Sequence, residues 1–324
     1  MNHPTVNGDI PGHLLRVSDL APETLVAVLD LAAAMKEEPL GWADSLRGAV
    51  IGCVFEKPST RTRVSLATAA HRLGMDALVL NRADLQLGHG ETVADTTRVL
   101  SSFLDALTMR TFEHSVVEEM AAVSTVPVVN ALSNTHHPCQ SLADLLALRE
   151  HFGSLTGMRT AFIGDGQSNT CNSFLAACAA SGMHLAIATP PAYETDDDIL
   201  REARELMART GGSVTLTTEP VEAVSGAQAV YAEVWVSMDK HDQPDERAER
   251  AERLARYRVD DDLLDHAAKD VVAMHCLPAV RGEEITSEVL DGPRSLAWRQ
   301  AANRLPTAQA VLHSLITTAR RRAS

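Results

Sequence analysis

Short runs of apolar residues alternate along the chain with segments whose apolar residues recur every three to four positions. A buried strand is expected from the first kind of segment and an amphipathic helix from the second. In the first half, strands are predicted at 48–55, 76–80, 105–110 and 126–132. The intervening helices are predicted at 64–74, 91–104, 115–123 and 140–155. This alternation favours a parallel sheet with helices on both faces.

The same rhythm restarts after the long amphipathic helix at 140–155. Further strands are predicted at 158–165, 184–190, 213–218, 227–235 and 270–277. Helices are predicted at 170–182, at 196–211 and at roughly 307–322. The fold class is therefore expected to be α/β, with two similar three-layer domains that divide near residue 150. Functional sites in such folds lie at the carboxyl ends of the strands, often in a cleft between domains.

Composition and charge restrict the classes of function. The chain has 324 residues, a formal net charge of −14, 45% hydrophobic residues and only 4% aromatic residues. An acidic globular protein with an aliphatic core is expected, and nucleic acid or an anionic membrane is disfavoured as a partner. The terminal 320–322 arginine run favours a solvated helix end over a binding tail.

Cysteine usage and the ends of the chain indicate a cytoplasmic protein. Five cysteines, an odd number without any C-x-x-C pair, suit reduced thiols better than disulfides or zinc. No run of 18 apolar residues predicts a membrane helix, and the N-terminal residues lack the pattern of a signal peptide.

Positive charge and hydroxyl groups gather in the stretch Ser59-Thr60-Arg61-Thr62-Arg63. The stretch lies between a predicted strand and a predicted helix. Backbone N–H groups and the helix dipole favour an anion there, and hydroxyl and guanidinium groups donate hydrogen bonds to phosphate. We favour a phosphate site over an ordinary helix cap with exposed arginines.

Four other stretches carry candidate chemistry. His136-His137-Pro138-Cys139-Gln140 lacks the spacing of a zinc site and suits either hydrogen bonding to a carbonyl or a capping histidine. In His275-Cys276, adjacent strand residues point to opposite sides, so a cysteine nucleophile activated by His275 is disfavoured. Gly164-Asp165-Gly166 lacks the rest of a dinucleotide motif, which disfavours NAD. The run 233–238, EVWVSM, is either an amino-acid pocket or an ordinary strand end.

The highly charged segment 240–259 allows two interpretations. It is either a solvated helix with i,i+4 ion pairs or a mobile lid over the cleft.

Taken together, STRTR, Met109-Arg110-Thr111, HPCQ and HCLP resemble the aspartate/ornithine carbamoyltransferase family across nearly the whole chain. HPCQ, HCLP and W-x-S-M are similar to the ornithine branch. The resemblance implies a carbamoyl-phosphate domain at 1–150, to which a C-terminal helix at 305–324 returns, and an ornithine-binding domain at 151–304. It also implies carbamoyl transfer to L-ornithine, a homotrimer or a multiple of trimers, and no metal or organic cofactor.

The resemblance also implies roles for individual residues. Those implied for catalysis are Arg110, His137, Cys276 and Thr62. Those implied to bind the two substrates are Ser59, Thr60, Arg61, Gln86, Gln140, Asn169, Glu233, Ser237, Met238, Leu277 and Arg304.

Departures from the family pattern cluster on the side of the second substrate. The family's usual Asp is Glu233 here, the usual Gly after Ser-Met is Asp239, and the C-terminal motif carries Ala302 and Pro306. A carbamoyltransferase for another amine-bearing amino acid is therefore a second hypothesis. A third is a catalytically silent protein that binds carbamoyl phosphate or a partner.

Overall fold

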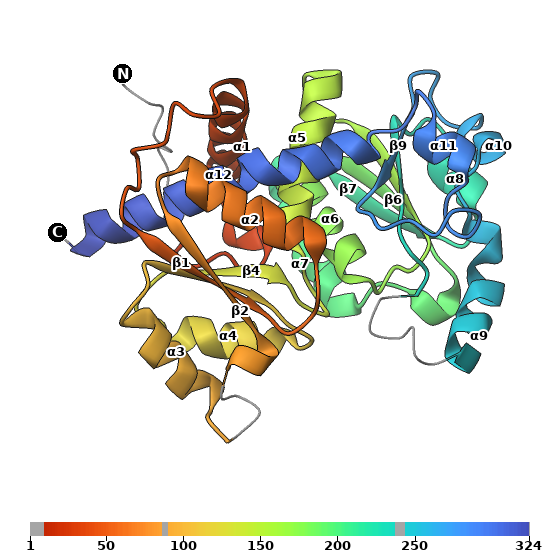
Figure 1. The fold of residues 1–324 in the computed structure, drawn as a ribbon. Coiled ribbons are helices and arrows are strands. Elements are labelled where there is room, and N and C mark those ends of the chain that lie inside the picture. The colour runs from red at the N-terminus through yellow and green to blue at the C-terminus, as the bar shows by residue number, and fades with distance from the viewer. Residues whose placement is uncertain (1–9, 86–89, 237–243, 324) are drawn as a thin grey trace. The chain divides into compact units, whose positions relative to one another are not determined.

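The computed structural model describes residues 10–85, 90–236 and 244–323, and it divides into two compact units. The first unit comprises residues up to Leu146 together with Asn303–Ser324, and the second comprises Ala147–Ala302. The two points of division fall inside long helices, α5 (Pro138–Phe152) and α12 (Ala297–Ala323), which Figure 1 shows in green and blue. Most of α12 therefore belongs to the first unit.

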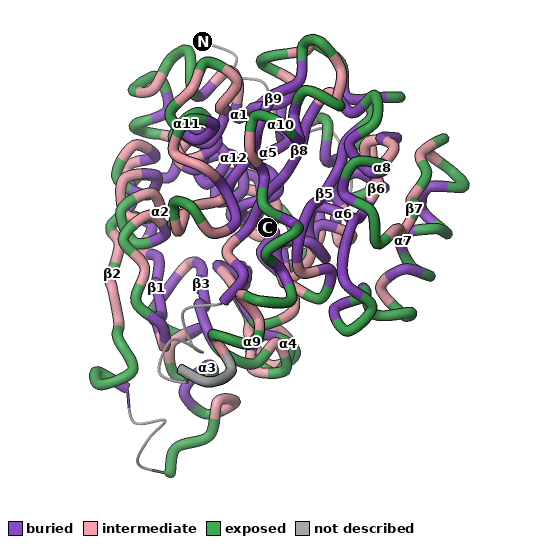
Figure 2. The backbone as a smooth tube through the Cα atoms, turned by 90° about the vertical axis from the view of Figure 1, so that its right-hand side faces the viewer, coloured by how far each residue is buried: buried purple, intermediate pink, exposed green. Residues whose placement is uncertain are grey.

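The first unit is built on a four-stranded parallel sheet with the order β2-β1-β3-β4. Its strands are β1 (Val50–Phe55), β2 (Asp76–Asn81), β3 (Ala106–Arg110) and β4 (Val128–Leu132). Its other helices are α1 (Pro22–Glu37), α2 (Thr60–Arg72), α3 (Val93–Ser101) and α4 (His114–Val123). The central strands β1 and β3 are largely buried, whereas the residues of the edge strand β2 are either exposed or half-buried (Figure 2).

Alternation along the strands separates the two faces of this sheet. Val54, Leu107 and Met109 pack with apolar side chains of α3 and α4 in one cluster. The next residues along each strand, including Arg110, point to the opposite face. On that face a hydrogen bond of 2.7 Å from Lys36 to Asn303 joins α1 to α12.

The second unit is built on a five-stranded parallel sheet with the order β7-β6-β5-β8-β9. Its strands are β5 (Arg159–Ile163), β6 (His184–Ala188), β7 (Ser213–Thr217), β8 (Ala229–Ala232) and β9 (Val272–His275). Its other helices are α6 (Asn169–Ala180), α7 (Asp197–Thr210), α8 (Pro220–Val224), α9 (Pro244–Leu254), α10 (Asp261–Leu264) and α11 (Ser287–Asp291).

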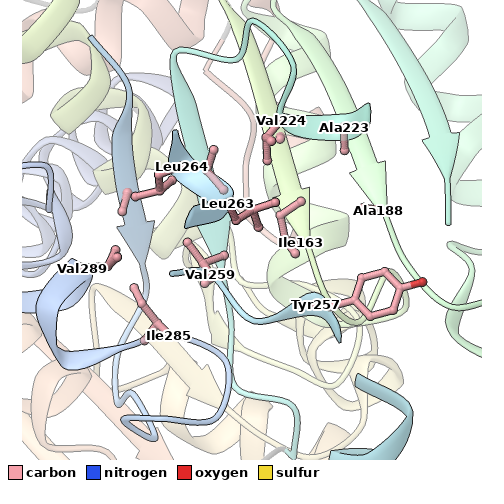
Figure 3. Close-up of a cluster of buried hydrophobic side chains, with 14 of the residues drawn as sticks. Ile163, Ala188, Ala223, Val224, Tyr257, Val259, Leu263, Leu264, Ile285 and Val289 are labelled. Carbon is pink, nitrogen blue, oxygen red and sulfur yellow. The ribbon is translucent and has the colours of Figure 1, made fainter. Parts of the chain in front are cut away.

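Aliphatic side chains form the core on one face of the second sheet. Ile163 and Ala188 from the strands pack with Val224, Leu264 and Val289 from the short helices (Figure 3). Phe162 lies on the other face, where Tyr231 and Phe174 of α6 pack around it. This second sheet places the carboxyl ends of β5, β8 and β9 side by side, because these three strands are neighbours.

The pattern-based prediction of an α/β fold with two parallel-sheet domains is confirmed, and so is the C-terminal helix that packs with the first. The start of that helix was predicted wrongly. It begins at Ala297 and runs through Pro306, not from about residue 307. Proline removes one backbone donor from a helix, and the helix nevertheless continues on both sides of this position. Helix α1 was not predicted.

Neither a membrane-spanning helix nor a metal site is found among the described residues. No helix in ranges 10–85, 90–236 and 244–323 combines the length and apolar character needed to cross a bilayer. Within the same ranges, no group of three or more His, Cys, Asp or Glu side chains is arranged to hold a metal ion.

Candidate active site

The candidate site of the first unit begins where β1 and β3 end. Phe55 pairs with Arg110 in the parallel register, so both strands finish at the same level. The N–H of Glu56 donates to the carbonyl of Arg110 at 2.9 Å, and the Thr111 hydroxyl donates to the Glu56 carboxylate. Arg110 therefore lies beside the loop that leads into α2.

Helix α2 begins in the stretch that was predicted to bind phosphate. The hydroxyl of Ser59 caps the helix by accepting the Thr62 N–H at 3.2 Å. Thr62 is buried, Arg61 is half-buried and Thr60 is exposed. The positive end of the helix dipole and the first backbone N–H groups thus lie among hydroxyl and guanidinium donors. Arg63 lies apart from them, because its guanidinium donates to the Asn81 side chain.

Arg304 from α12 connects three residues that are far apart in sequence. One guanidinium nitrogen donates to Oε1 of Gln140 at 2.7 Å and lies 3.4 Å from Nε2 of His137. The other donates to the hydroxyl of Thr62 at 3.3 Å. All four side chains are buried. The structure thus brings together four of the residues that the sequence singled out.

His137 is neutral at physiological pH. Burial lowers its pKa well below the ordinary value, and the positive charges of Arg304, Arg110 and Arg61 lower it further. Since a guanidinium cannot accept a hydrogen bond, Nε2 of His137 accepts from Arg304 and the ring proton lies on Nδ1. Three guanidinium groups thus act on one uncharged imidazole, which suits a ligand with concentrated negative charge.

Sequence reasoning missed two charged residues of this unit. Lys57 is buried two residues before the helix cap, with its ammonium 4.1 Å from the centre of the Phe112 ring. Asp144 is fully buried on α5, where it accepts a hydrogen bond of 2.8 Å from Gln140 and orients that amide. Lys57 could have been proposed as a site residue from the sequence, because it is basic and lies just before STRTR.

The candidate site of the second unit lies at the carboxyl ends of β5, β8 and β9. Ser168 caps α6 by accepting the Cys171 N–H at 3.0 Å. Its hydroxyl donates to Oε2 of Glu233 at 2.6 Å, and the Cys276 thiol lies 3.9 Å from Oε1 of the same carboxyl group. Asn169 is the first residue of α6. Asn169, Glu233 and Cys276, all predicted site residues, therefore follow three adjacent strands, and Ser168 was missed.

Glu233 has a strongly altered acidity. Its pKa is raised from 4.5 to about 7, first because the carboxyl group is buried. Hydrogen bonds from Ser168 and Thr170 oppose this increase, and the nearby carboxylates of Asp165 and Glu284 add to it. A buried carboxylate in an acidic surrounding favours a cationic partner.

The loop that follows β9 holds Cys276 and Leu277 in an unusual backbone conformation. Leu277 has a φ of +56°, the only positive value at a non-glycine position among the described residues. Such a conformation costs about 1–2 kcal/mol for a residue with a Cβ atom. His275 is fully buried and bonds to Glu284 at 3.1 Å, away from Cys276. As predicted, it is not placed to act as a base for that thiol.

Part of the charged segment 240–259 forms α9. An i,i+4 ion pair joins Glu249 to Arg253, as expected for a solvated helix. Arg250, however, is largely buried. It donates to the Asp165 carboxylate and to the carbonyl of Trp235 at 2.9 Å, and it stacks on Tyr193. Helix α9 is thereby fixed to the loops after β5, β6 and β8.

Some of the predicted residues lie outside the described residues. These are Gln86, Ser237 and Met238, together with the variant position Asp239.

The chain consists of two parallel-sheet α/β units. In each unit, polar side chains gather at the carboxyl ends of the strands, which is typical of two-domain proteins that bind small molecules.

Two family models match the chain. Residues 12–150 match the carbamoyl-P binding domain of aspartate/ornithine carbamoyltransferase, and residues 156–315 match its Asp/Orn binding domain. The chain belongs to the aspartate/ornithine carbamoyltransferase family.

Individual relatives agree with this assignment. The ornithine carbamoyltransferase of Clavibacter michiganensis is 46% identical over 300 residues, which cover 93% of this chain and 97% of the relative. That of Bacillus subtilis is 44% identical over 303 residues, with 94% and 93% covered. The solved structure of ornithine carbamoyltransferase from Pyrococcus furiosus is similar with a TM-score of 0.89 and 41% identity, covering 94% of this chain and 97% of that one.

Proposed function

We propose that this protein transfers the carbamoyl group of carbamoyl phosphate to the side-chain amine of L-ornithine, which yields L-citrulline and phosphate. The first unit would bind carbamoyl phosphate, and the second would bind the amino acid. Relatives named ornithine carbamoyltransferase, which match over more than nine tenths of the chain, support this substrate pair.

The observation that carries the proposal is the contact of Arg304 with Thr62, His137 and Gln140. The phosphate group would lie at the start of α2 and accept hydrogen bonds from backbone N–H groups, from Ser59, Thr60 and Thr62, and from Arg61. Arg110 would reach both the phosphate and the carbonyl oxygen. His137 and Gln140 would orient the carbamoyl group, and Gln86 would add a further contact.

In the proposed reaction the neutral amine of ornithine attacks the carbamoyl carbon. The new C–N bond forms, the C–O bond to phosphate breaks, and the leaving phosphate takes the proton of the amine. Negative charge builds on the carbonyl oxygen in the transition state. Donors from Arg110, His137 and Thr62 would stabilise it, and a single such donor is often worth about 3–4 kcal/mol.

The amine substrate would be held by the residues after β5, β8 and β9. The Glu233 carboxylate suits the cationic ammonium group of an amino acid, since burial among acidic neighbours makes the ionised form dependent on a positive partner. Asn169, Ser237 and Met238 would contact the amino-acid part, and Cys276 and Leu277 would line the reacting amine. Positioning two substrates in this way supplies a large part of the rate enhancement.

The direct test is carbamoyl-phosphate-dependent phosphate release with a panel of amines. Ornithine, lysine, 2,4-diaminobutyrate, putrescine and N-acetylornithine would be compared, and the ureido product identified by mass. A preference for ornithine is expected. Absence of turnover with every amine, despite measurable binding of carbamoyl phosphate, would contradict the proposed activity and favour a silent binding protein.

A second candidate is carbamoyl transfer to a different amine-bearing amino acid. It is motivated by Glu233, whose side chain is one methylene longer than the usual Asp and is fixed by Ser168 at 2.6 Å. Glu233→Asp is expected to shift the order of kcat/KM values among the amines. An unchanged order, with ornithine first in both proteins, would exclude a role of this residue in substrate choice.

We also propose that the protein is a cytoplasmic homotrimer, or a multiple of trimers, of arginine metabolism. All five cysteines are free thiols, which supports a reducing compartment. Sedimentation of the purified protein would test the trimer.

A further inference from the structure

The loop after β9 contains two side chains of the proposed amine site, Cys276 and Leu277, and the strained backbone of Leu277. A non-glycine residue remains in the left-handed region only where its surroundings hold it there. A fully buried pair, His275 and Glu284, supplies the contacts that hold it. Neither residue has a role in the reaction as proposed above.

His275 binds the loop with both ring nitrogens. Its Nδ1 accepts the N–H of Leu277 at 2.8 Å, so the ring proton is on Nε2, which lies 3.1 Å from Oε1 of Glu284. The same Oε1 accepts the N–H of Val280 at 2.6 Å. The N–H of His275 itself donates to Gln300 at 2.9 Å.

These contacts close a ring across the loop. One end is the backbone of Leu277, the other is the backbone of Val280, and the His275–Glu284 pair bridges them. The carboxyl group has no hydrogen bond at Oε2 among the described residues. Its identified hydrogen bonds are therefore those of this bridge. Burial of this polar group costs free energy that an apolar, space-filling residue would not require.

We propose that Glu284, acting through His275, is a positioning residue for the amine site. It selects the ring tautomer that accepts the Leu277 N–H, and it thereby sets where Cys276 and Leu277 present their side chains. This proposal rests on the proposed function, because it assigns the pair to the binding of the amine. It does not involve the carbamoyl phosphate residues of the first unit.

The test compares Glu284→Ala, Glu284→Gln and the control Glu288→Ala. Glu288 is an exposed carboxylate on α11, four residues further along the chain. Glu284→Ala is expected to lower kcat/KM for ornithine by about 30- to 100-fold, as a small misplacement of binding groups does. Its Kd for carbamoyl phosphate should be unchanged. Glu284→Gln should restore most of the activity, because an amide oxygen accepts the same two hydrogen bonds.

A readout independent of turnover is the alkylation of Cys276 by iodoacetamide, located by peptide mass. The other four cysteines are buried. A severalfold change in the Cys276 rate is expected in Glu284→Ala and not in Glu284→Gln or Glu288→Ala. If the wild-type protein carbamoylates no amine, this rate still tests the positioning of the loop, which separates failure of this proposal from failure of the proposed function.

Should Glu284→Ala fail to fold, His275→Asn takes its place. Its side-chain oxygen accepts the Leu277 N–H as Nδ1 does, but it does not reach Glu284. The proposal expects loss of amine kcat/KM and an altered alkylation rate in this variant also. Folded Glu284→Ala or His275→Asn protein with both quantities within about threefold of the wild type, a difference below 1 kcal/mol, would overturn it.

Discussion

Glu233→Gln is expected to stabilise the protein in a pH-dependent manner. Glutamine has the shape of the protonated carboxyl group but cannot ionise. The pKa of Glu233 is about 7 in the folded protein and 4.5 in the unfolded chain. This difference of about 2.5 corresponds to about 3 kcal/mol of unfolding free energy.

The sign of the effect follows from proton binding. Below pH 4.5 the carboxyl group is protonated in both states, so the contribution of Glu233 to stability is fully present. Between pH 4.5 and about 7 the unfolded chain releases the proton while the folded protein retains it, and stability falls. Above pH 7 both states are ionised and the loss stays constant. Glutamine avoids this loss, so its advantage grows from near zero at pH 4.5 to about 3 kcal/mol at pH 8.

The assay is urea unfolding of both proteins at a series of pH values, each followed by tryptophan fluorescence, to which Trp235, buried two residues from position 233, contributes. The midpoint difference between variant and wild type is expected to increase steadily over the range. Glu288→Gln, at an exposed carboxylate, should give a difference that is flat with pH. A flat difference for Glu233→Gln, or one that decreases with pH, would refute the assignment of Glu233 as a carboxyl group whose pKa is raised by folding.

The other predictions concern three arginines. Arg110→Ala should lower kcat by about 100- to 1,000-fold because it removes a donor to the carbonyl oxygen, and steady-state phosphate release would measure it; a loss confined to KM would contradict that role. Arg304→Lys should raise the Kd for carbamoyl phosphate by about tenfold or more, since an ammonium cannot replace the forked contacts to Gln140 and Thr62; calorimetry with an unchanged Kd would exclude it. Arg250→Ala should raise KM for the amine without changing the Kd for carbamoyl phosphate, because it releases Asp165 and Trp235; an equal change in both constants would point to general unfolding.

Local patterns predicted most of the fold, since each strand and most helices carry their own apolar periodicity. The predictions failed at two helices. Pro306 reads as a helix boundary, yet α12 continues through it, and most of this helix belongs to the first unit. Helix α1 was not predicted, although Pro22 at its first position and the spacing of its apolar residues are typical of a helix.

The candidate site divides in the same way. The stretch around Arg61 could be identified from the sequence because an unusual density of hydrogen-bond donors lies in one short segment. Ser168 and Glu284 did not, since each is an ordinary polar residue whose meaning depends on a partner 65 or nine positions away. Periodicity carries no information about such pairings. Sequence reasoning therefore found the residues proposed to touch substrates and missed those that hold them.

The charges of the two units favour the binding of a different substrate in each unit. In the first unit, burial lowers the pKa of His137 and the nearby guanidinium groups lower it further, and a dianion that binds among these groups relieves their mutual repulsion. In the second, burial raises the pKa of Glu233 and the nearby carboxylates of Asp165 and Glu284 add to the increase, so a bound cation would stabilise the ionised form. Carbamoyl phosphate, an acyl phosphate, carries the charge that the first unit favours, and the ammonium group of an amino acid carries the charge that the second favours. Exchanging the substrates between the units would place like charges together in buried surroundings, which costs several kcal/mol. The local charge of each site, and not the negative net charge of the whole chain, therefore determines which substrate each unit favours.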